Sequence, residues 1–332
     1  MLISFAAIVI GLAVLVWSAD RFVDGAASIA RQLGVSSMIV GITIIGFGTS
    51  APEILISVIA VLEQTPDIAI GNALGSNIAN IGLILGITAL VMPLPIAREI
   101  LNQEFPLLLL ATAIMSWCLY DGVLDILDGT LLLTLLAIIL WYLVKAHQRN
   151  PAASISEIEL ANDIEEDMSL LSSSGWVFVG LVLLVGSSKL LVWGATGVAH
   201  KLGISELIIG LTIVALGTSL PELAAAIASI KKNEPDLAIG NIIGSNLFNS
   251  LAVIGIPATI TSFSISNLAV TRDLPVVIAI TLLFYGLSRF PVTGAQNLSR
   301  LKGFWLLSAF VIYQLYLYYG VMTTNGVMTD IS

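Results

Sequence analysis

The sequence predicts an all-α membrane protein, with ten transmembrane helices arranged as two inverted five-helix repeats. Three observations predict this fold. The 332 residues are 57% hydrophobic and 11% charged, with a mean hydropathy of +1.00, whereas a soluble domain carries roughly 25% charged residues. Apolar segments of the length that crosses the hydrocarbon as a helix follow one another along the chain. The second half of the chain also repeats the first at a constant offset.

The apolar segments are expected to be helices, because the strand alternation of a membrane β-barrel is absent. The expected spans are 2–19, 36–62, 68–91, 105–120, 127–145, 175–195, 205–230, 237–259, 271–288 and 303–321. The first span has no basic segment before it, so it is interpreted as a membrane helix and not as a cleaved signal. The expected division is a first repeat at 1–146, an acidic linker at 147–174 and a second repeat at 175–332.

The repeat is visible without any gap. Residues 34–90 and 203–259 align at an offset of 169 with 24 identities in 57 positions. The identities concentrate in Gly, Thr, Ser, Pro, Glu and Asn, so shared apolar character does not explain them. Five spans per repeat is an odd number, so the second repeat must enter the membrane from the opposite side. This is the plan of secondary transporters, which bind substrate near the bilayer midplane between the repeats.

The basic residues predict the orientation of the chain. Ten lysines and arginines fall on the side of the linker, and only Lys201 and Arg272 fall on the other side. Because basic loops stay in the cytoplasm, we expect a cytoplasmic linker, both termini outside, and a location in the plasma (inner) membrane.

Two related motifs place a proline and a carboxylate inside apolar segments: GTSAPE ends at Glu53 and GTSLPE ends at Glu222. Proline lacks an N–H and its ring crowds the preceding turn, so we expect the first of these helices to kink or unwind near Gly48. An acidic side chain such as Asp costs about 2.5–3.5 kcal/mol near the centre of a membrane helix. A structural hydrogen bond between helices would explain one such residue, whereas a repeated pair favours a shared ion site.

Hydroxyl and amide side chains accompany each glutamate. Thr49 and Ser50 precede Glu53 by about one helical turn, and Ser76 and Asn80 share one face of the next helix. The second repeat offers the matching set of Thr218, Ser219, Glu222, Ser245 and Asn249. Such an all-oxygen set suits Ca²⁺, Mg²⁺ or Na⁺, and a flexible site of six to eight oxygens favours Ca²⁺. The single cysteine, Cys118, excludes a disulfide.

The doubled pattern GTS-x-PE followed by GN-x-x-GSN-x-x-N resembles the α-repeats of the cation/Ca²⁺ exchanger superfamily, in its sodium/calcium exchanger branch of prokaryotic calcium/sodium antiporters. The resemblance covers nearly the whole chain. It implies that the residues named above bind the ions, together with the backbone carbonyls of Gly46 and Ala215. Asparagine at both Asn80 and Asn249 gives no support for potassium cotransport.

The expected function is a secondary-active antiporter that exchanges Ca²⁺ for Na⁺ by alternating access, and not an enzyme. The alternative is a Ca²⁺/H⁺ antiporter that uses the same two glutamates, and a cation channel is a more distant one. The expected partners are Ca²⁺, Na⁺, H⁺ in the alternative, and the lipid bilayer. We expect no cofactor, no nucleic acid and no obligate protein partner, and the net charge of −9 disfavours nucleic acid.

Overall fold

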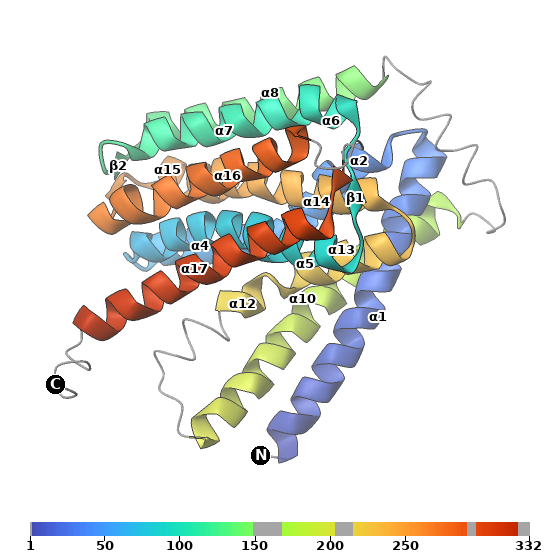
Figure 1. Ribbon diagram of the computed structural model, residues 1–332, viewed down its shortest axis with the longest axis horizontal. Helices are drawn as coiled ribbons and strands as arrows, with labels where there is room; N and C mark the ends of the chain where they lie inside the picture. The colour runs from blue at the N-terminus through green and yellow to red at the C-terminus, as the bar shows by residue number, and fades with distance from the viewer. Residues whose placement is uncertain (1, 149–167, 203–214, 291–296, 325–332) are drawn as a thin grey trace.

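The computed structural model describes residues 2–148, 168–202, 215–290 and 297–324, and within these residues the chain is almost entirely helical (Figure 1). In this described part, nine helices are long and apolar enough to cross a membrane. The expected span at 205–230 lies partly outside the described residues, which contain only its second half. The expected linker at 147–174 lies mostly outside them as well.

The first half contains five helical segments joined by short connections. Their elements are α1 (Leu2–Leu33), α2 (Ser37–Val40), the π-helix η1 (Gly41–Ile45), α3 (Gly46–Leu62), α4 (Pro66–Ala79), the π-helix η2 (Asn80–Leu85), α5 (Gly86–Val91), β1 (Leu94–Pro95), α6 (Arg98–Asn102), α7 (Glu104–Leu119), β2 (Val123–Leu124) and α8 (Ile126–Gln148).

The second half follows the same order. Its elements are α10 (Leu170–Lys201), α12 (Ala215–Thr218), α13 (Leu220–Lys231), α14 (Pro235–Phe248), the π-helix η4 (Asn249–Val253), α15 (Ile254–Ile260), β3 (Phe263–Ser264), the π-helix η5 (Ala269–Asp273), α16 (Leu274–Arg289), β4 (Asn297–Leu298) and α17 (Arg300–Thr324). Helix α10 begins five residues before the expected span, and α1 continues 14 residues beyond its expected end.

Matching turns join the central helices of each half. Gln64 and Asn233 adopt positive φ angles of 62° and 58°, and this left-handed conformation ends α3 and α13. Pro66 and Pro235 then occupy the first turn of α4 and α14, where a missing N–H costs nothing. Each half therefore presents a tight helical hairpin built from the same signals.

Of the kink or unwinding expected near Gly48, unwinding is wrong for the first half. Helix α3 runs continuously through Pro52, directly after the π-helix Gly41–Ile45. Packed neighbours and π-helical adjustments allow a membrane helix to tolerate proline. In the second half the helix is interrupted, because Ser219 has non-helical angles between α12 and α13.

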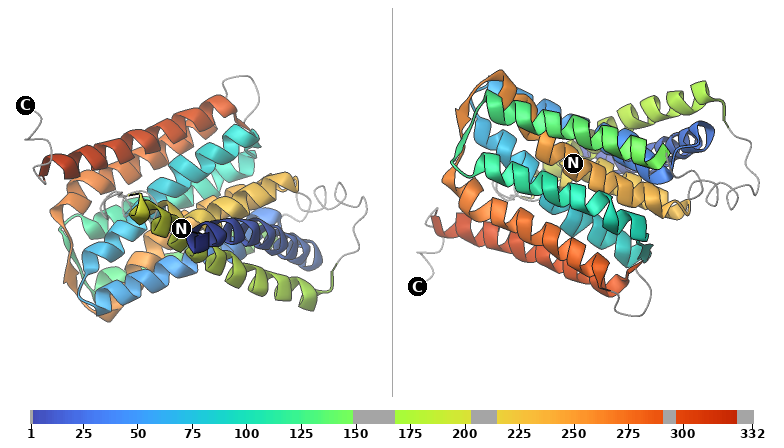
Figure 2. Two further views of the ribbon diagram at one scale, coloured as in Figure 1. Left: turned by 90° about the horizontal axis from the view of Figure 1, so that it is seen from below. Right: turned by 90° about the horizontal axis from the view of Figure 1, so that it is seen from above.

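The long helices α1 and α10 pack mainly on each other and lie at an angle to the other long helices, and α1 also packs against α13 (Figures 1 and 2). Lys232, at the end of α13, ties α1 to the rest: its Nζ lies 2.8 Å from Asp20 Oδ1 and 2.7 Å from Asp24 Oδ1. Burial lowers the pKa of Lys232, but hydrogen bonds to the two carboxylates outweigh burial and raise it overall.

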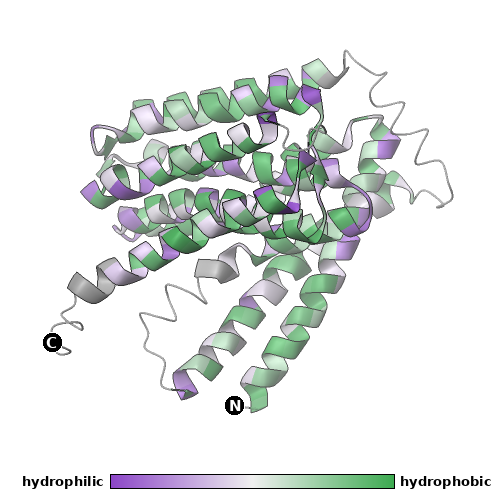
Figure 3. Cartoon of the chain, in the orientation of Figure 1, coloured by the Kyte–Doolittle hydropathy of each residue, from purple (hydrophilic) through white to green (hydrophobic). Residues whose placement is uncertain are grey.

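Helices α4 and α14 occupy the middle of the larger group. Every residue in the apolar window of Pro235–Ile260 is buried, as is 72% of the window of Pro66–Val91. Helices α7 and α16 meet through Phe105 and Phe284, whose ring centroids are 4.6 Å apart. The outer surfaces of the long helices are largely hydrophobic (Figure 3), which suits contact with lipid.

Elements near the end of each half pack against elements of the other half. Helix α8 packs on α15, and α17 packs on α5. The antiparallel pair β1–β4 joins Leu94 to Leu298, and the pair β2–β3 joins Leu124 to Phe263. Each half therefore completes the packing of the other, and the polar face of α14 is surrounded by protein.

Candidate functional site

Four neighbouring helical segments bring the candidate side chains together. Helix α3 packs against α4, α13 and α14, and α13 packs against α14 and η2. Helix α3 carries the first glutamate and its hydroxyls, and α4 with η2 carries the first serine–asparagine pair. Segments α12–α13 and α14–η4 carry the equivalent residues of the second half. The nearly complete burial of these side chains places the cluster inside the protein, away from lipid.

In α3, the glutamate and the neighbouring serine have no hydrogen-bond partners among the described residues. Glu53 is 1% exposed, and both of its carboxylate oxygens are buried without such a partner. Ser50 Oγ is in the same situation. A buried ionised carboxylate without compensation is very unfavourable, so this part of the site has the oxygen chemistry of a cation-binding site.

The side chain of Thr49, in the first half of the chain, contacts residues of the second half. Its Oγ1 lies 3.2 Å from Asn241 Oδ1 and 3.3 Å from Ser245 Oγ, and it is within hydrogen-bonding reach of the Glu222 carboxylate. The structure therefore brings Thr49 of the first half next to residues 192 and 196 positions further along the chain.

The two asparagines at the ends of the motifs occupy equivalent positions. Asn80 is the first residue of η2 and Asn249 is the first residue of η4. Both are almost fully buried, and neither the amide oxygen nor the amide nitrogen of either side chain has a partner among the described residues. π-helical turns inside α-helices frequently occur at functional sites.

The remaining candidates have less uniform surroundings. Ser76 and Ser219 are buried, whereas Thr218 is half-buried at the end of α12. Gly46 begins α3, and a Cβ built there would lie 3.0 Å from the backbone of Gly244 and Ser245, so the two helices touch backbone to backbone. Ala215 is the first residue of α12.

The donor set is poor in carboxylates and rich in neutral oxygens. Among the described residues, no group of three or more His, Cys, Asp or Glu side chains could hold a metal ion. Two carboxylates with hydroxyl and amide oxygens are suited to a weakly held hard cation and unsuited to zinc or copper. Such a cation can leave again, as transport requires.

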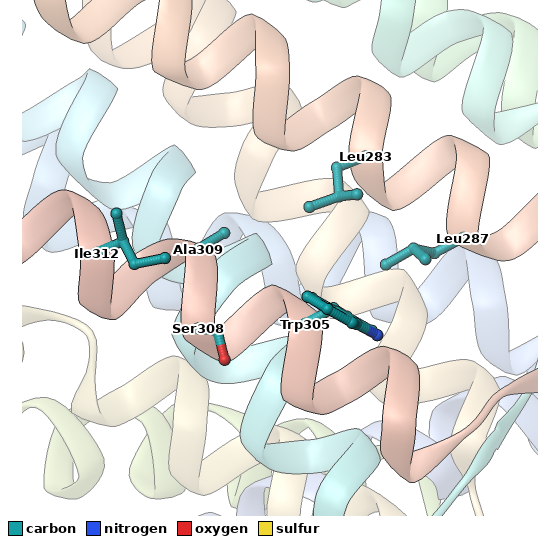
Figure 4. A pocket seen from close by; sticks show the side chains of 6 residues that line it. All are labelled: Leu283, Leu287, Trp305, Ser308, Ala309 and Ile312. Atoms are coloured by element: carbon teal, nitrogen blue, oxygen red, sulfur yellow. The ribbon is translucent and has the colours of Figure 1, made fainter.

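A separate hollow between α16 and α17 has different chemistry (Figure 4). Its volume is about 300 Å³, and it is lined by Leu283, Leu287, Trp305, Ser308, Ala309 and Ile312. The Ser308 hydroxyl is the only side-chain oxygen in this lining, which is too few oxygen ligands for a cation site.

Two residues at the site were not among the candidates chosen from the sequence. Asn241 Oδ1 accepts a hydrogen bond from the Thr49 hydroxyl, and Asn241 Nδ2 donates one to the backbone oxygen of Glu222 at 3.3 Å. Asn72 makes the equivalent bond to the backbone oxygen of Glu53 at 3.1 Å. Both are the asparagine of the repeated Gly-Asn pair, which was the available signal.

Comparison with known proteins identifies the family. The profile of the family "Sodium/calcium exchanger protein" matches residues 3–145 and 172–319. The chain is 43% identical over 318 residues to the putative antiporter CaxA of Alkalimonas amylolytica, covering 96% of this chain and 99% of that protein. It is 40% identical to the inner membrane protein YrbG of Escherichia coli, over 96% of this chain and 98% of that one.

The fold agrees with solved structures. A structure of the sodium-calcium exchanger NCX_Mj, soaked with 2.5 mM Na⁺ and 0.1 mM Ca²⁺, superimposes with a TM-score of 0.79 at 31% identity, covering 93% of this chain and 96% of that one. The class is therefore an all-α, multi-pass membrane antiporter. The chain belongs to the sodium/calcium exchanger family, within the cation/Ca²⁺ exchanger superfamily.

Proposed function

We propose that this protein exchanges Ca²⁺ for Na⁺ by alternating access, at a site formed between its two halves. The observation that carries the proposal is the pair of buried glutamates, Glu53 and Glu222, on packed helices with three of their four carboxylate oxygens unpartnered among the described residues. Titratable groups inside membrane proteins mark ion pathways, and carboxylate, hydroxyl and amide oxygens are the ligands of a hard divalent cation.

The proposed ligands come equally from both halves. They are Glu53, Thr49, Ser50, Ser76, Asn80 and the Gly46 carbonyl, with Glu222, Thr218, Ser219, Ser245, Asn249 and the Ala215 carbonyl. The carboxylates supply the charge that attracts the cation. The hydroxyl, amide and carbonyl oxygens replace its water shell, and they let the same cavity accept Ca²⁺ or several Na⁺ ions.

The proposed architecture is ten transmembrane helices in two inverted five-helix repeats. Its support is the order of elements, which is the same in both halves, and the reciprocal packing of α8 on α15 and of α17 on α5. The tenth helix is the expected span at 205–230, of which the structure describes α12 and most of α13. The helices α1 and α10 pack mainly on each other, so the pair is suited to move as one body against the other helices, as alternating access requires.

Coupling follows from charge. With both glutamates ionised the empty site carries −2, and moving that charge through a low-dielectric occluded state is unfavourable. One Ca²⁺ neutralises the site, as do two Na⁺, and a third Na⁺ would leave +1. The site therefore changes from one side of the membrane to the other more readily with ions bound than when it is empty. Each return of the site requires a bound ion, and the result is exchange.

The proposed orientation places the 147–174 linker in the cytoplasm and both termini outside, in the plasma (inner) membrane. Its support is the excess of ten basic residues on the linker side against two on the other. The inner membrane is also where the name of the Escherichia coli relative places that protein.

Ion competition tests the site directly. Purified protein in detergent should bind ⁴⁵Ca²⁺, and Na⁺ should displace it cooperatively at constant pH and ionic strength, with choline replacing Na⁺. Protonation would also neutralise the two glutamates, which keeps Ca²⁺/H⁺ exchange as the second candidate. Displacement by lowering pH with no effect of Na⁺ would favour that candidate and contradict our proposal.

A further inference from the structure

The repeated Gly-Asn pair places one asparagine beside each glutamate of the site. Asn72 lies four residues before Ser76 on α4, and Asn241 lies four residues before Ser245 on α14. Residues four apart share one face of a helix, so each asparagine faces the same neighbour as the proposed ion ligands. None of the proposed ligand positions includes either asparagine.

The two asparagines make the same hydrogen bond in both halves. Asn72 Nδ2 donates to the backbone oxygen of Glu53 at 3.1 Å, and Asn241 Nδ2 donates to the backbone oxygen of Glu222 at 3.3 Å. Each bond joins the helix that carries a glutamate to the helix that carries the neutral oxygens. The bonded carbonyl is attached to the Cα of the glutamate itself, so the bond fixes the origin of its side chain.

We propose that Asn72 and Asn241 are positioning residues, which set the distance between each glutamate and the serine–asparagine pair opposite it and thereby the size of the cation cavity. This inference rests on the proposed Ca²⁺/Na⁺ exchange. Selectivity among hard cations depends on cavity size and ligand flexibility. Loss of either hydrogen bond therefore weakens Ca²⁺ binding and reduces discrimination against the larger Sr²⁺.

The two positions differ in their other partners, and this predicts unequal effects. Asn241 is fully buried and its Oδ1 also accepts from Thr49 and Ser245, at 3.2 and 3.4 Å. Asn72 is half-buried and its Nδ2 also donates to Ser57 Oγ at 3.2 Å. Substitution of Asn241 therefore disturbs ligands of both halves, whereas substitution of Asn72 disturbs mainly the first glutamate.

The test compares Asn72→Leu and Asn241→Leu with Ser57→Ala. Leucine keeps a similar volume and removes the donor. Ser57→Ala removes the other partner of Asn72 but leaves the bond to Glu53, and the repeat already has Ala226 at the equivalent position. The measurements are ⁴⁵Ca²⁺ binding to purified protein, Na⁺-driven Ca²⁺ uptake into proteoliposomes, and competition of each by Sr²⁺.

We expect the leucine variants to raise the KM for Ca²⁺ about tenfold, within the range of about 10–100-fold for residues that orient metal ligands. The ratio of Sr²⁺ to Ca²⁺ affinity should rise, more for Asn241→Leu, while Ser57→Ala keeps both wild-type values. A purely structural role would lower the amount of folded protein and leave the KM and this ratio unchanged in what remains. If Asn241→Leu is not monodisperse, Asn72→Leu carries the test.

Unchanged KM and ion ratio in monodisperse leucine variants would overturn the positioning role, even where wild-type exchange is normal. An equal loss in Ser57→Ala would also overturn it, because the effect would then come from contact between the helices. Failure of the proposed function looks different: wild-type protein would bind ⁴⁵Ca²⁺ without Na⁺-driven uptake, and the binding arm would still measure the effect of each asparagine.

Discussion

The packing of Gly244 against α2–η1 gives a sharp test of how the site is built. A Cβ added at Gly244 would lie 2.7 Å from Ile42 Cα, against 3.4 Å for ordinary van der Waals contact, and closer still to the Ile42 carbonyl oxygen. Substitution Gly244→Ala must therefore move one backbone by at least about 0.7 Å to bring the Ile42 Cα from 2.7 to 3.4 Å. Overpacking of this kind costs about 1–3 kcal/mol, and Gly244 directly precedes Ser245 of the site.

The repeat supplies a matched control. Gly75 is the equivalent residue of the first half, and a Cβ there meets nothing within 4 Å. Gly75→Ala should be silent or slightly stabilising, because alanine is favoured over glycine within a helix by about 1 kcal/mol. We expect Gly244→Ala to lower the unfolding temperature in detergent by several degrees and to slow Ca²⁺ uptake at least tenfold. Misplacement of about 1 Å can cost 10²-fold in rate.

Thermal unfolding and uptake into proteoliposomes should be measured for both variants at matched protein incorporation. The reasoning would be refuted if both variants behaved alike, or if Gly75→Ala were the more damaging. Either result would mean that the contact between α14 and η1 does not position the site.

The remaining predictions concern charge, neutral ligands and orientation. Glu53→Gln and Glu222→Gln should each abolish Ca²⁺ transport without unfolding the protein, because each removes one of two charges and little volume; normal flux in either would show that the site lies elsewhere. Asn249→Ala should weaken transport less, since water can partly replace a neutral ligand, and an effect equal to that of a glutamate variant would argue against this ranking. In a Cys118→Ser background, a cysteine introduced into the 147–174 segment should react with an impermeant reagent only from the cytoplasmic side, and labelling from outside would reverse the orientation.

Much of the proposed site could be predicted from the sequence, because its residues lie within short motifs that occur twice. Motif spacing placed Thr49 near Glu53, and the offset of 169 predicted that the second set would be equivalent. In the structure, Thr49 Oγ1 lies 3.3 Å from Ser245 Oγ, in the other half. Lipid offers no hydrogen-bond partners to polar residues inside apolar segments. Such residues are therefore expected to face one another within the protein.

Other features depend on tertiary packing and could not be predicted in this way. Pro52 predicted a kink or unwinding near Gly48, yet α3 continues as one helix through Pro52, directly after the π-helix Gly41–Ile45. Two glycines in identical GSN motifs have opposite surroundings, crowded at Gly244 and open at Gly75. The repeat encodes equal sequences, but only the assembled helices determine which copy is in close contact.

Coupling is the central claim, and one flux measurement tests it most directly. Wild-type protein is reconstituted into Na⁺-loaded proteoliposomes at equal pH on both sides, with a protonophore present and the membrane potential clamped by K⁺ and valinomycin. The account predicts Ca²⁺ uptake that requires internal Na⁺, is lost in Glu53→Gln and Glu222→Gln, and responds to voltage if three Na⁺ exchange for one Ca²⁺. Uptake that ignores internal Na⁺ but follows an imposed pH gradient, measured without the protonophore, would contradict it.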